Sequence, residues 1–348
     1  MAGGIGSRFW PFSRTNFPKQ FHDILGTGKT LIQQTADRYV DVCPPENIYV
    51  VTNKEYYALV KNQLPYLADE QILLEPSGKN TAPCVAYAAM KIAQKNPDAN
   101  LVVCPADHVI LKEENFVRTI HACLESTRDQ DILLTMGITP SRPDTGYGYI
   151  QFLEGNGTVK KVKTFTEKPQ LELALQFLES GDFVWNSGIF IWNTKAILKA
   201  LETHLPEMYE IFHEGAAAYY TETEQAFIDK AYSLVKNVSV DIGIMEKAPN
   251  VFVMLAEFGW SDLGTWKSLY DLSEKDIIGN AIEGNVLLYD TSNCIVRGST
   301  DKLIVVEGLD NYIVAESDGV FMICRKDQEQ RVKDFVADCK SRKDKRFV

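Results

Sequence analysis

The sequence predicts an α/β fold with a mixed, mainly parallel sheet, followed by a small all-β unit and a terminal helix. From residue 48 onward, short β-branched runs alternate with longer helix-compatible stretches, as in βαβ units. After Gly279 the apolar runs recur about every 8 to 10 residues, separated by Gly, Asn and Asp turns. This second pattern is typical of a small β unit such as a few coils of a β-solenoid.

The elements of the first part follow in chain order. The strands IYVVT, QILLE, LVVCP and DILLTMGI alternate with helices expected near 54–64, 81–95 and 114–127. The segments GYGYIQFLEG, VKKVKTFTEKP and FVWNSGIFIW are predicted to be longer, partly antiparallel strands, and 194–235 to be mostly helical. Ligands of such sheets usually bind at the carboxyl ends of the strands, which directs attention to the residues after each strand.

The tail repeats one short pattern. Its predicted strands are NVLLYD, NCIVRG, KLIVVEG, NYIVAES and GVFMICRK, and a helix rich in Lys and Arg is expected near 327–342. We therefore predict two domains, residues 1–278 and residues 279–348.

The composition is that of an ordinary globular protein, with 348 residues of which 45% are hydrophobic and 24% charged. The formal net charge of -11 argues against a nucleic-acid or anionic-membrane partner, because polyphosphate surfaces would repel the protein. A phosphate ligand must therefore be met by a local basic cluster.

The seven cysteines are dispersed and form no C-x-x-C pair, so we predict buried, reduced thiols of a cytoplasmic protein. The histidines show no H-E-x-x-H spacing. The apolar runs are far shorter than the roughly 20 residues of a membrane span.

The opening stretch AGGIGSRFWPFSRTNFPKQF combines Gly3, Gly4 and Gly6 with the cations Arg8 and Lys19. Glycines let consecutive backbone N–H groups approach phosphate oxygens closely. The alternative is a mobile glycine-rich segment, which the glycines alone would favour.

This stretch resembles the signature A-G-G-x-G-x-R-x-x-P-x-S-R…P-K of sugar-nucleotide pyrophosphorylases, and FWPFSR and PKQF resemble the mannose-1-phosphate guanylyltransferase branch. Further matching blocks are EPSGKNTAP, PADH, TGYGYI, FTEKP, WNSGIFIW, SVDIGIMEKA and WSDLGTW. The resemblance covers residues 1–275 motif by motif and continues more loosely through the tail. It implies a Rossmann-like nucleotidyltransferase domain that transfers GMP from GTP to mannose 1-phosphate, with GDP-mannose and pyrophosphate as products and Mg²⁺ as cofactor.

The resemblance also implies roles for charged residues. Arg8 and Lys19 would cover the triphosphate, and Lys168 would bind the phosphate of the sugar substrate. Asp107 and Asp262 would hold Mg²⁺, since this cation prefers carboxylate, phosphate and water oxygens. Taken alone, each aspartate would more often be a helix N-cap, and Lys168 an exposed surface lysine.

The remaining candidates bind the base or the sugar. The nucleotide-binding set is Gly3, Gly4, Gly6, Ser7, Glu75, Asn80, Thr81, Ala82 and Pro105, and the sugar-binding set is Gly148, Glu167, Asn186 and Asp241. For Asn186 a structural role in a strand turn stays open, and for Asp241 and Glu246 the charged ends of a short helix. Trp185, Trp192 and Trp266 are predicted to be core residues.

Only Met1 and Ala2 precede the glycine-rich loop, whereas the family places a buried strand before it. We therefore expect the first strand to be truncated by about five to eight residues, a strand's usual length.

Two other functions stay open at this point. A sibling enzyme with a different nucleotide or hexose phosphate would share the metal and phosphate residues. A non-catalytic regulatory paralogue would bind the sugar nucleotide without turnover. The tail could pack on the catalytic domain or mediate a homodimer.

Overall fold

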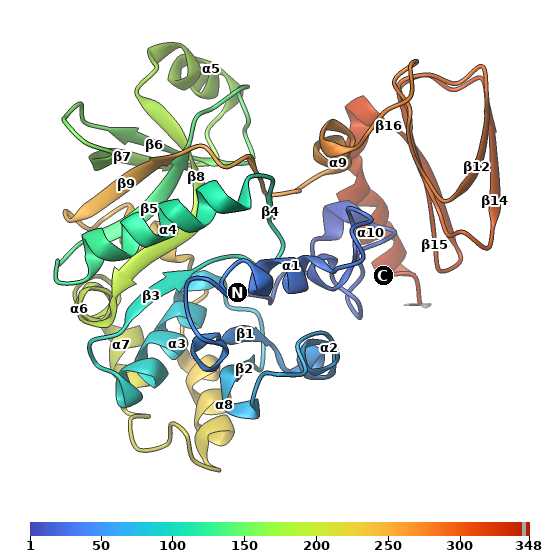
Figure 1. Cartoon of the computed structure of the whole chain (residues 1–348). Coiled ribbons are helices and arrows are strands. Elements are labelled where there is room, and N and C mark those ends of the chain that lie inside the picture. The colour runs from blue at the N-terminus through green and yellow to red at the C-terminus, as the bar shows by residue number, and fades with distance from the viewer. Residues whose placement is uncertain (343–345) are drawn as a thin grey trace. The chain divides into compact units, whose positions relative to one another are not determined.

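The computed structural model describes residues 1–342 and 346–348, which form two compact units. The first unit comprises residues 1–3, 35–106 and 110–260, and the second unit comprises residues 4–34, 107–109 and 261–348. Figure 1 labels many of their helices and strands. The predicted boundary at residues 278 and 279 lies inside the second unit.

The first unit is built around a six-stranded sheet and a separate parallel pair. The pair consists of β1 (Val50–Asn53) and β2 (Ile72–Glu75). Across the larger sheet the strands are β3 (Asn100–Val103), β8 (Phe183–Asn193), β5 (Leu133–Ile138), β9 (Val251–Ala256), β7 (Val159–Glu167) and β6 (Gly148–Phe152). The pairings give β3, β5, β6 and β9 one direction and β7 and β8 the other. The prediction of a mixed sheet is confirmed, and four of the six strands run in the same direction. The predicted mainly parallel pairing is not found, because among the described residues β5 and β9 are the only neighbours in this sheet that pair in parallel.

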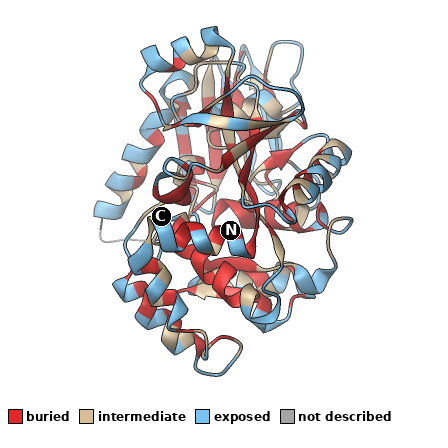
Figure 2. Ribbon diagram, turned by 90° about the vertical axis from the view of Figure 1, so that its left-hand side faces the viewer, coloured by how far each residue is buried: buried red, intermediate tan, exposed pale blue. Residues whose placement is uncertain are grey.

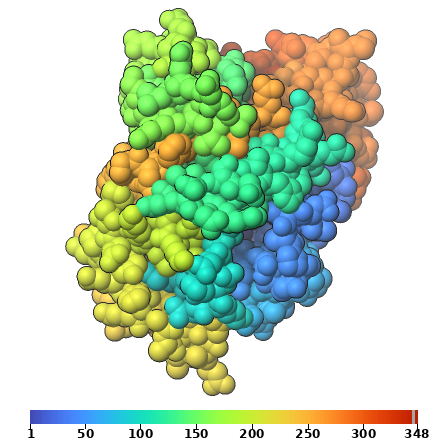
Figure 3. Space-filling model, turned by 60° about the vertical axis from the view of Figure 1, so that its left-hand side comes forward, coloured from blue at the N-terminus to red at the C-terminus, as the bar shows by residue number. Residues whose placement is uncertain are grey.

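Helices cover both faces of the larger sheet because its strands carry apolar residues on both sides. Along β8, Phe190 and Trp192 belong to one core cluster, and Ile189 and Ile191 to another. The helix α4 (Glu113–Thr127) packs on the second of these faces, contacting β3, β5, β8 and β9. Figure 2 shows how burial alternates with exposure on the helices, and Figure 3 shows α4 in green on the surface.

The opposite face is covered by α3 (Thr81–Lys95), whose bounds match the predicted helix over 81–95, together with α6 (Thr194–His204) and α7 (Pro206–His213). The other helical elements of this unit are η3 (Pro45–Asn47), η4 (Lys54–Tyr56), α2 (Tyr57–Gln63), η5 (Asp69–Gln71), α5 (Leu171–Ser180), α8 (Glu224–Leu234) and the π-helical turn η6 (Asp241–Met245). The mostly helical stretch predicted over 194–235 is confirmed.

Met1 and Ala2 lie between β1 and the end of β3. The Ala2 N–H donates to the Val51 carbonyl at 2.7 Å, and the Met1 amino group donates to the Cys104 carbonyl at 2.8 Å. The Ala106 N–H returns a hydrogen bond to the Met1 carbonyl at 2.9 Å. The first two residues thus link the parallel pair to the larger sheet.

The second unit contains a parallel β-solenoid. One sheet has the order β11 (Ala281–Glu283), β13 (Ile295–Arg297), β15 (Tyr312–Ser317) and β16 (Val320–Arg325), and the other pairs β12 (Asn285–Tyr289) with β14 (Leu303–Glu307). All these pairings are parallel except that of β15 with β16. Because Ile295 pairs with Ile313, and Asn285 with Leu303, one coil comprises two strands and their turns. The predicted β-solenoid is confirmed.

The glycine-rich loop packs against this solenoid. Phe9 and Trp10 share a core cluster with residues of β11, β13, β15 and β16. The helical elements of this unit are η1 (Ser7–Phe9), η2 (Lys19–Phe21), α9 (Trp266–Leu272), η7 (Lys326–Arg331) and α10 (Val332–Ser341). Three elements span the residues at which the chain changes from one unit to the other: α1 (Leu31–Asp37), β4 (Val109–Ile110) and β10 (Trp260–Ser261).

Candidate functional site

The glycine-rich loop needs glycine at position 6. Gly6 has φ of 66°, and a Cβ atom there would lie 2.8 Å from Cβ of Lys19. The turn η1 begins directly after it and places Arg8 half-buried. Within residues 1–342 and 346–348, Arg8 has neither a hydrogen-bond nor an ion-pair partner. This cation is therefore available to an anionic ligand.

Lys19 is held by three oxygen atoms of the second unit, and we call Lys19, Asp107 and Asp262 the Lys19 cluster. Its ammonium lies 2.9 Å from a carboxylate oxygen of Asp107 and donates to the carbonyls of Asp262 at 2.8 Å and Leu263 at 3.1 Å. Lys19 is only 3% exposed. Two segments that carry the predicted metal ligands thus meet at one buried lysine.

The two aspartates of the Lys19 cluster differ in their surroundings. Burial alone would raise the pKa of Asp107, but the nearby Lys19 ammonium and His108 outweigh it and lower that pKa. The Asp262 carboxylate accepts a hydrogen bond from the Gly264 N–H at 3.0 Å. The described residues contain no group of three or more His, Cys, Asp or Glu side chains able to hold a metal ion. A cation here would need oxygens from substrate or water besides the two carboxylates.

The predicted sugar-binding residues and Lys168 come together in the first unit, and we call them the Glu167 cluster. Gly148 and Glu167 are paired across β6 and β7, and a Cβ atom on Gly148 would lie 2.6 Å from Oε2 of Glu167. The Asn186 side chain donates to Oδ1 of Asp241 at 2.8 Å. Lys168 forms an ion pair with Glu167 and has φ of 50°, which is uncommon outside glycine.

Asp241 is the most perturbed carboxyl of the Glu167 cluster. Burial and the charge of Glu167 raise the pKa of Asp241 to about 6, although Asn186 and Lys168 oppose the shift. Burial and Glu167 also raise the pKa of Glu246. Two carboxylates close together, one of them reluctant to ionise, suit hydrogen bonding to hydroxyl groups.

Several predicted nucleotide-binding residues hold the start of α3. Asn80 caps this helix, and its side chain accepts a hydrogen bond from the Thr81 N–H at 3.0 Å. The Thr81 hydroxyl accepts from the Val240 N–H at 2.9 Å, and the Ala82 N–H donates to the Val238 carbonyl at 3.1 Å. These contacts position the segment that leads into Asp241.

Glu75 ends β2 and is 7% exposed. Its Oε1 accepts a hydrogen bond from the Tyr232 hydroxyl at 2.8 Å, and its Oε2 would lie 3.0 Å from a Cβ atom on Gly3. Of the other predicted residues, Pro105 is in the first unit and Gly4 and Ser7 are in the second.

The sequence patterns did not predict the contact of Tyr232 with Glu75 or the structural role of Arg14. Tyr232 is one apolar-facing residue of a helix, and nothing in AYSLV distinguishes it from core. The Arg14 guanidinium donates to the carbonyls of Pro11, Ser317 and Arg346, so it ties the loop to the C-terminal segments. The prediction that three tryptophans are core residues is confirmed: Trp185, Trp192 and Trp266 are at most 4% exposed.

Four of the seven predicted buried thiols are buried, whereas Cys43, Cys104 and Cys339 are partly exposed. All seven cysteines are free of disulfides. Among the described residues, no helix combines the length and apolar character needed to span a bilayer.

Comparison with known proteins identifies the class. The nucleotidyl transferase family matches residues 1–278, and a MannoseP isomerase/GMP-like beta-helix domain matches residues 284–338. The chain belongs to the nucleotidyl transferase family.

Individual members of this family are similar to the chain over most of its length. The alginate biosynthesis protein AlgA of Pseudomonas aeruginosa is 38% identical over 349 residues, which cover 97% of this chain and 71% of that protein. The mannose-1-phosphate guanylyltransferase of Escherichia coli is 32% identical over 346 residues, covering 97% and 74% respectively. A crystal structure from Thermus thermophilus, named mannose-1-phosphate geranyltransferase, matches 98% of both chains with 30% identity and a TM-score of 0.88. The resemblance inferred from the motifs is confirmed.

Proposed function

We propose that this protein transfers GMP from GTP to mannose 1-phosphate, with GDP-mannose and pyrophosphate as products. The name of the Escherichia coli relative supports this choice among nucleotidyl transferases. The observation that carries it is the Glu167 cluster, where one lysine and two carboxylates meet at the ends of β7 and η6. A hexose phosphate needs such a set: a cation for its phosphate and acceptors for its hydroxyls.

A phosphate oxygen of the sugar substrate attacks the α-phosphorus of GTP, and pyrophosphate leaves in line. The attacking phosphate is already largely ionised at neutral pH, so no general base is needed. Lys168 binds this phosphate, and its positive φ supports this role, because such a backbone constrains how the side chain is presented. Glu167, Asn186 and Asp241 bind the sugar hydroxyls, and the Gly148 backbone lies beside them.

Arg8 and Lys19 stabilise the negative charge that grows on the departing pyrophosphate. Arg8 suits this role because it is half-buried and has no partner among the described residues. The glycine-rich loop contributes the backbone N–H groups of Gly4, Gly6 and Ser7 to the phosphates.

Asp107 and Asp262 are the residues that would hold Mg²⁺. The donor set fits this cation, because both groups are carboxylates and the lowered pKa of Asp107 keeps that side chain ionised. When bound, Mg²⁺ neutralises phosphate charge and orients the phosphates for in-line transfer.

The base is read near Glu75, with Gly3, Asn80, Thr81, Ala82 and Pro105 around the nucleotide. The unbridged cysteines support a reducing compartment, and we propose a cytoplasmic enzyme.

The decisive experiment measures pyrophosphate release with GTP, ATP, dTTP and UTP, each with mannose 1-phosphate or glucose 1-phosphate. The proposal expects the highest kcat/KM for GTP with mannose 1-phosphate. A dominant ATP or dTTP rate would assign a sibling activity, and sugar-nucleotide binding without turnover would indicate a regulatory protein.

The metal assignment has its own test. Asp107→Asn and Asp262→Asn should each lower kcat by about 100-fold or more, as expected when a charge-stabilising group is lost. Asp229→Asn is the matched control, because Asp229 pairs with Lys54 on the surface at 3.0 Å. Unchanged turnover in both site variants would remove the metal role.

A further inference from the structure

The two oxygens of the Glu75 carboxylate have different surroundings: Tyr232 bonds one of them, and Gly3 lies beside the other. The buried Tyr232 hydroxyl, in a residue 1% exposed, donates to its Oε1 at 2.8 Å. The other oxygen, Oε2, faces Gly3, where the absence of a side chain keeps the space beside it clear. One oxygen is therefore committed to the protein, and the other remains as an acceptor.

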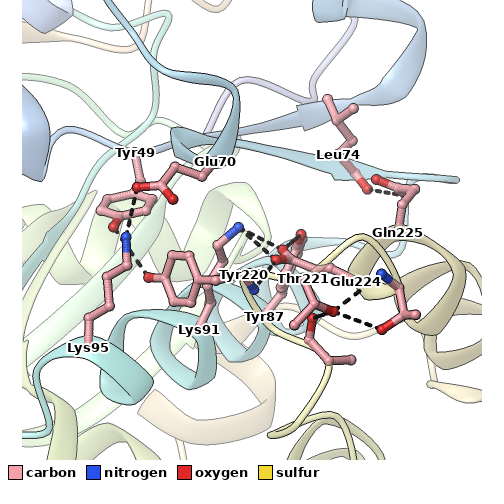
Figure 4. A network of polar contacts seen from close by, with 12 residues as sticks. Tyr49, Glu70, Leu74, Tyr87, Lys91, Lys95, Tyr220, Thr221, Glu224 and Gln225 are labelled. Carbon is pink, nitrogen blue, oxygen red and sulfur yellow. Dashed lines mark hydrogen bonds and ion pairs between the residues drawn. The ribbon is translucent and has the colours of Figure 1, made fainter.

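The helix that carries Tyr232 is anchored at its start. Figure 4 shows Glu224, the first residue of α8, accepting from Lys91 at 2.7 Å and from Tyr87 at 2.5 Å. The next residue, Gln225, donates to the carbonyl of Leu74 at 3.2 Å, directly before Glu75. The ion pair of Lys91 and Glu224 is buried, so α8 cannot shift along β2 without exposing or separating these charges. The position of the Tyr232 hydroxyl is therefore set by the fold.

The ionisation state of a carboxyl decides which base edge it can bind. Guanine presents two adjacent N–H donors, which suit an ionised carboxylate that only accepts. Adenine presents one N–H donor next to a ring nitrogen acceptor, which an ionised carboxylate repels and a protonated carboxyl can bind. A group that keeps Glu75 ionised thus favours guanine over adenine.

The surroundings of Glu75 push its ionisation in opposite directions. Burial raises the pKa of Glu75, whereas the Tyr232 hydrogen bond lowers it. The Cys84 thiol of α3 also faces this carboxylate, and burial together with Glu75 raises the pKa of that thiol, so it stays neutral. Burial raises the pKa of Tyr232 well above its usual value, so the phenol keeps the proton that it donates.

We propose that Tyr232 is a positioning residue for base selection: its hydroxyl orients Glu75 and keeps it an acceptor, which makes the enzyme prefer guanine nucleotides. This inference rests on the proposed function. It adds a specificity determinant that makes no contact with the nucleotide.

The test compares kcat/KM for GTP and ATP in the wild type and in Tyr232→Phe, from about pH 6 to about pH 9. At neutral pH we expect Tyr232→Phe to lower the GTP-to-ATP ratio by about tenfold, mainly through KM for GTP. Raising the pH should restore the ratio, because it ionises Glu75 without the phenol. A wild-type ratio and pH profile in Tyr232→Phe would overturn the proposal.

Tyr219→Phe is the matched control. Tyr219 is also buried, and its hydroxyl donates to the Phe212 carbonyl at 2.8 Å, so the substitution removes an equivalent hydrogen bond. It should keep the wild-type nucleotide ratio at every pH. A comparable loss of preference in this control would show that the effect is one of general stability and would overturn the proposal.

Two further variants keep the test independent of how well Tyr232→Phe folds. Glu75→Gln should abolish the pH dependence of the ratio, and Tyr232→Phe added to it should change the ratio no further. Gly3→Ala places a Cβ atom 3.0 Å from Oε2 and should also lower the GTP-to-ATP ratio. Additive effects of the Glu75 and Tyr232 changes would contradict the proposal. If the wild type itself shows no preference for GTP, the proposed function fails, and not the role of Tyr232 alone.

Discussion

Lys19 and Asp107 form an ion pair of 2.9 Å in which the lysine is almost fully buried and the aspartate side chain is 31% exposed. The same ammonium donates to the carbonyls of Asp262 and Leu263. One side chain therefore connects the loop that follows the glycine-rich segment with both predicted metal-ligand segments.

Lys19→Met should lower both stability and activity. Removing the charge leaves Asp107 without its cation and two carbonyls without their donor, at a cost of about 1–3 kcal/mol in the free energy of unfolding. The lowered pKa of Asp107 means that the pair stabilises the fold above the pKa of an unfolded aspartate, and that this stability is lost as the pH falls. Urea unfolding at several pH values measures both effects.

Lys54→Met is the control for this charge removal. Lys54 and Asp229 are both more than 40% exposed, so the change should cost less than about 1 kcal/mol. Equal losses in the two variants would contradict a special role for the buried lysine.

Gly148→Ala should impair sugar binding more than stability. The added Cβ atom would lie 2.6 Å from Oε2 of Glu167, and this flexible side-chain end can rotate away at a cost of about 1 kcal/mol. The displaced carboxylate then no longer meets the hydroxyl that it binds, so KM for mannose 1-phosphate should rise by about tenfold. Steady-state kinetics and thermal melting test this, with Gly155→Ala, where the Cβ atom meets no neighbour, as the control. Normal KM in Gly148→Ala would show that Glu167 does not contact the sugar.

Asp241→Asn should stabilise the protein at alkaline pH and weaken its activity. Because burial and Glu167 raise the pKa of Asp241 to about 6, the folded state binds its proton more tightly than the unfolded chain does. Stability is therefore lost as the pH rises from about 4 to about 6, by up to about 3 kcal/mol. Asparagine removes this penalty, so the variant should melt higher than the wild type at about pH 8 and not at about pH 4.

Asp310→Asn should lower the melting temperature at about pH 8, which is the opposite of the change expected for Asp241→Asn. Hydrogen bonds from Asn293 and Ser292 lower the pKa of Asp310, so its ionised form stabilises the fold at neutral pH. A higher melting temperature for Asp310→Asn at about pH 8 would show that the pKa argument fails for this protein.

Arg14→Ala should destabilise the second unit strongly. Arg14 is 6% exposed and donates to four carbonyls, those of Pro11, Ser317, Asp318 and Arg346. Leaving these acceptors unpaired should lower the free energy of unfolding by about 3 kcal/mol or more. The enzyme should also lose activity, because the loop that carries Arg8 is no longer held in place. Arg128→Ala, at a surface ion pair whose arginine is 65% exposed, should change stability by less than about 0.5 kcal/mol. Similar unfolding curves for the two variants would refute the role of Arg14.

Much of the fold could be predicted from local patterns. The helix over 81–95 was predicted at its observed bounds from the alternation of strands and helix-compatible stretches, and Asn80 caps it in the structure. The solenoid was predicted from short apolar runs between turn residues, although β11 was missed because three residues carry too little pattern. FVWNSGIFIW was predicted to be a longer strand, and β8 spans Phe183–Asn193 with most of its residues buried.

The contacts of the candidate site could not be predicted from local sequence patterns. Arg8 and Arg14 belong to the same short basic segment, yet Arg8 has no partner among the described residues, whereas Arg14 is bonded to carbonyls about 300 positions away. Tyr232 had no motif to mark it, because a hydroxyl in a helical apolar stripe is indistinguishable from core until its acceptor is known.

The sequence by itself determined the elements, the family and the residue types of the chemistry, since these depend on local spacing and on motifs read along the chain. Only the tertiary structure decided which oxygens each cation meets, which carboxyl is forced toward its protonated form, and which tyrosine faces Glu75. Those outcomes depend on burial and on contacts between segments far apart in the chain, and electrostatic energies change steeply with both.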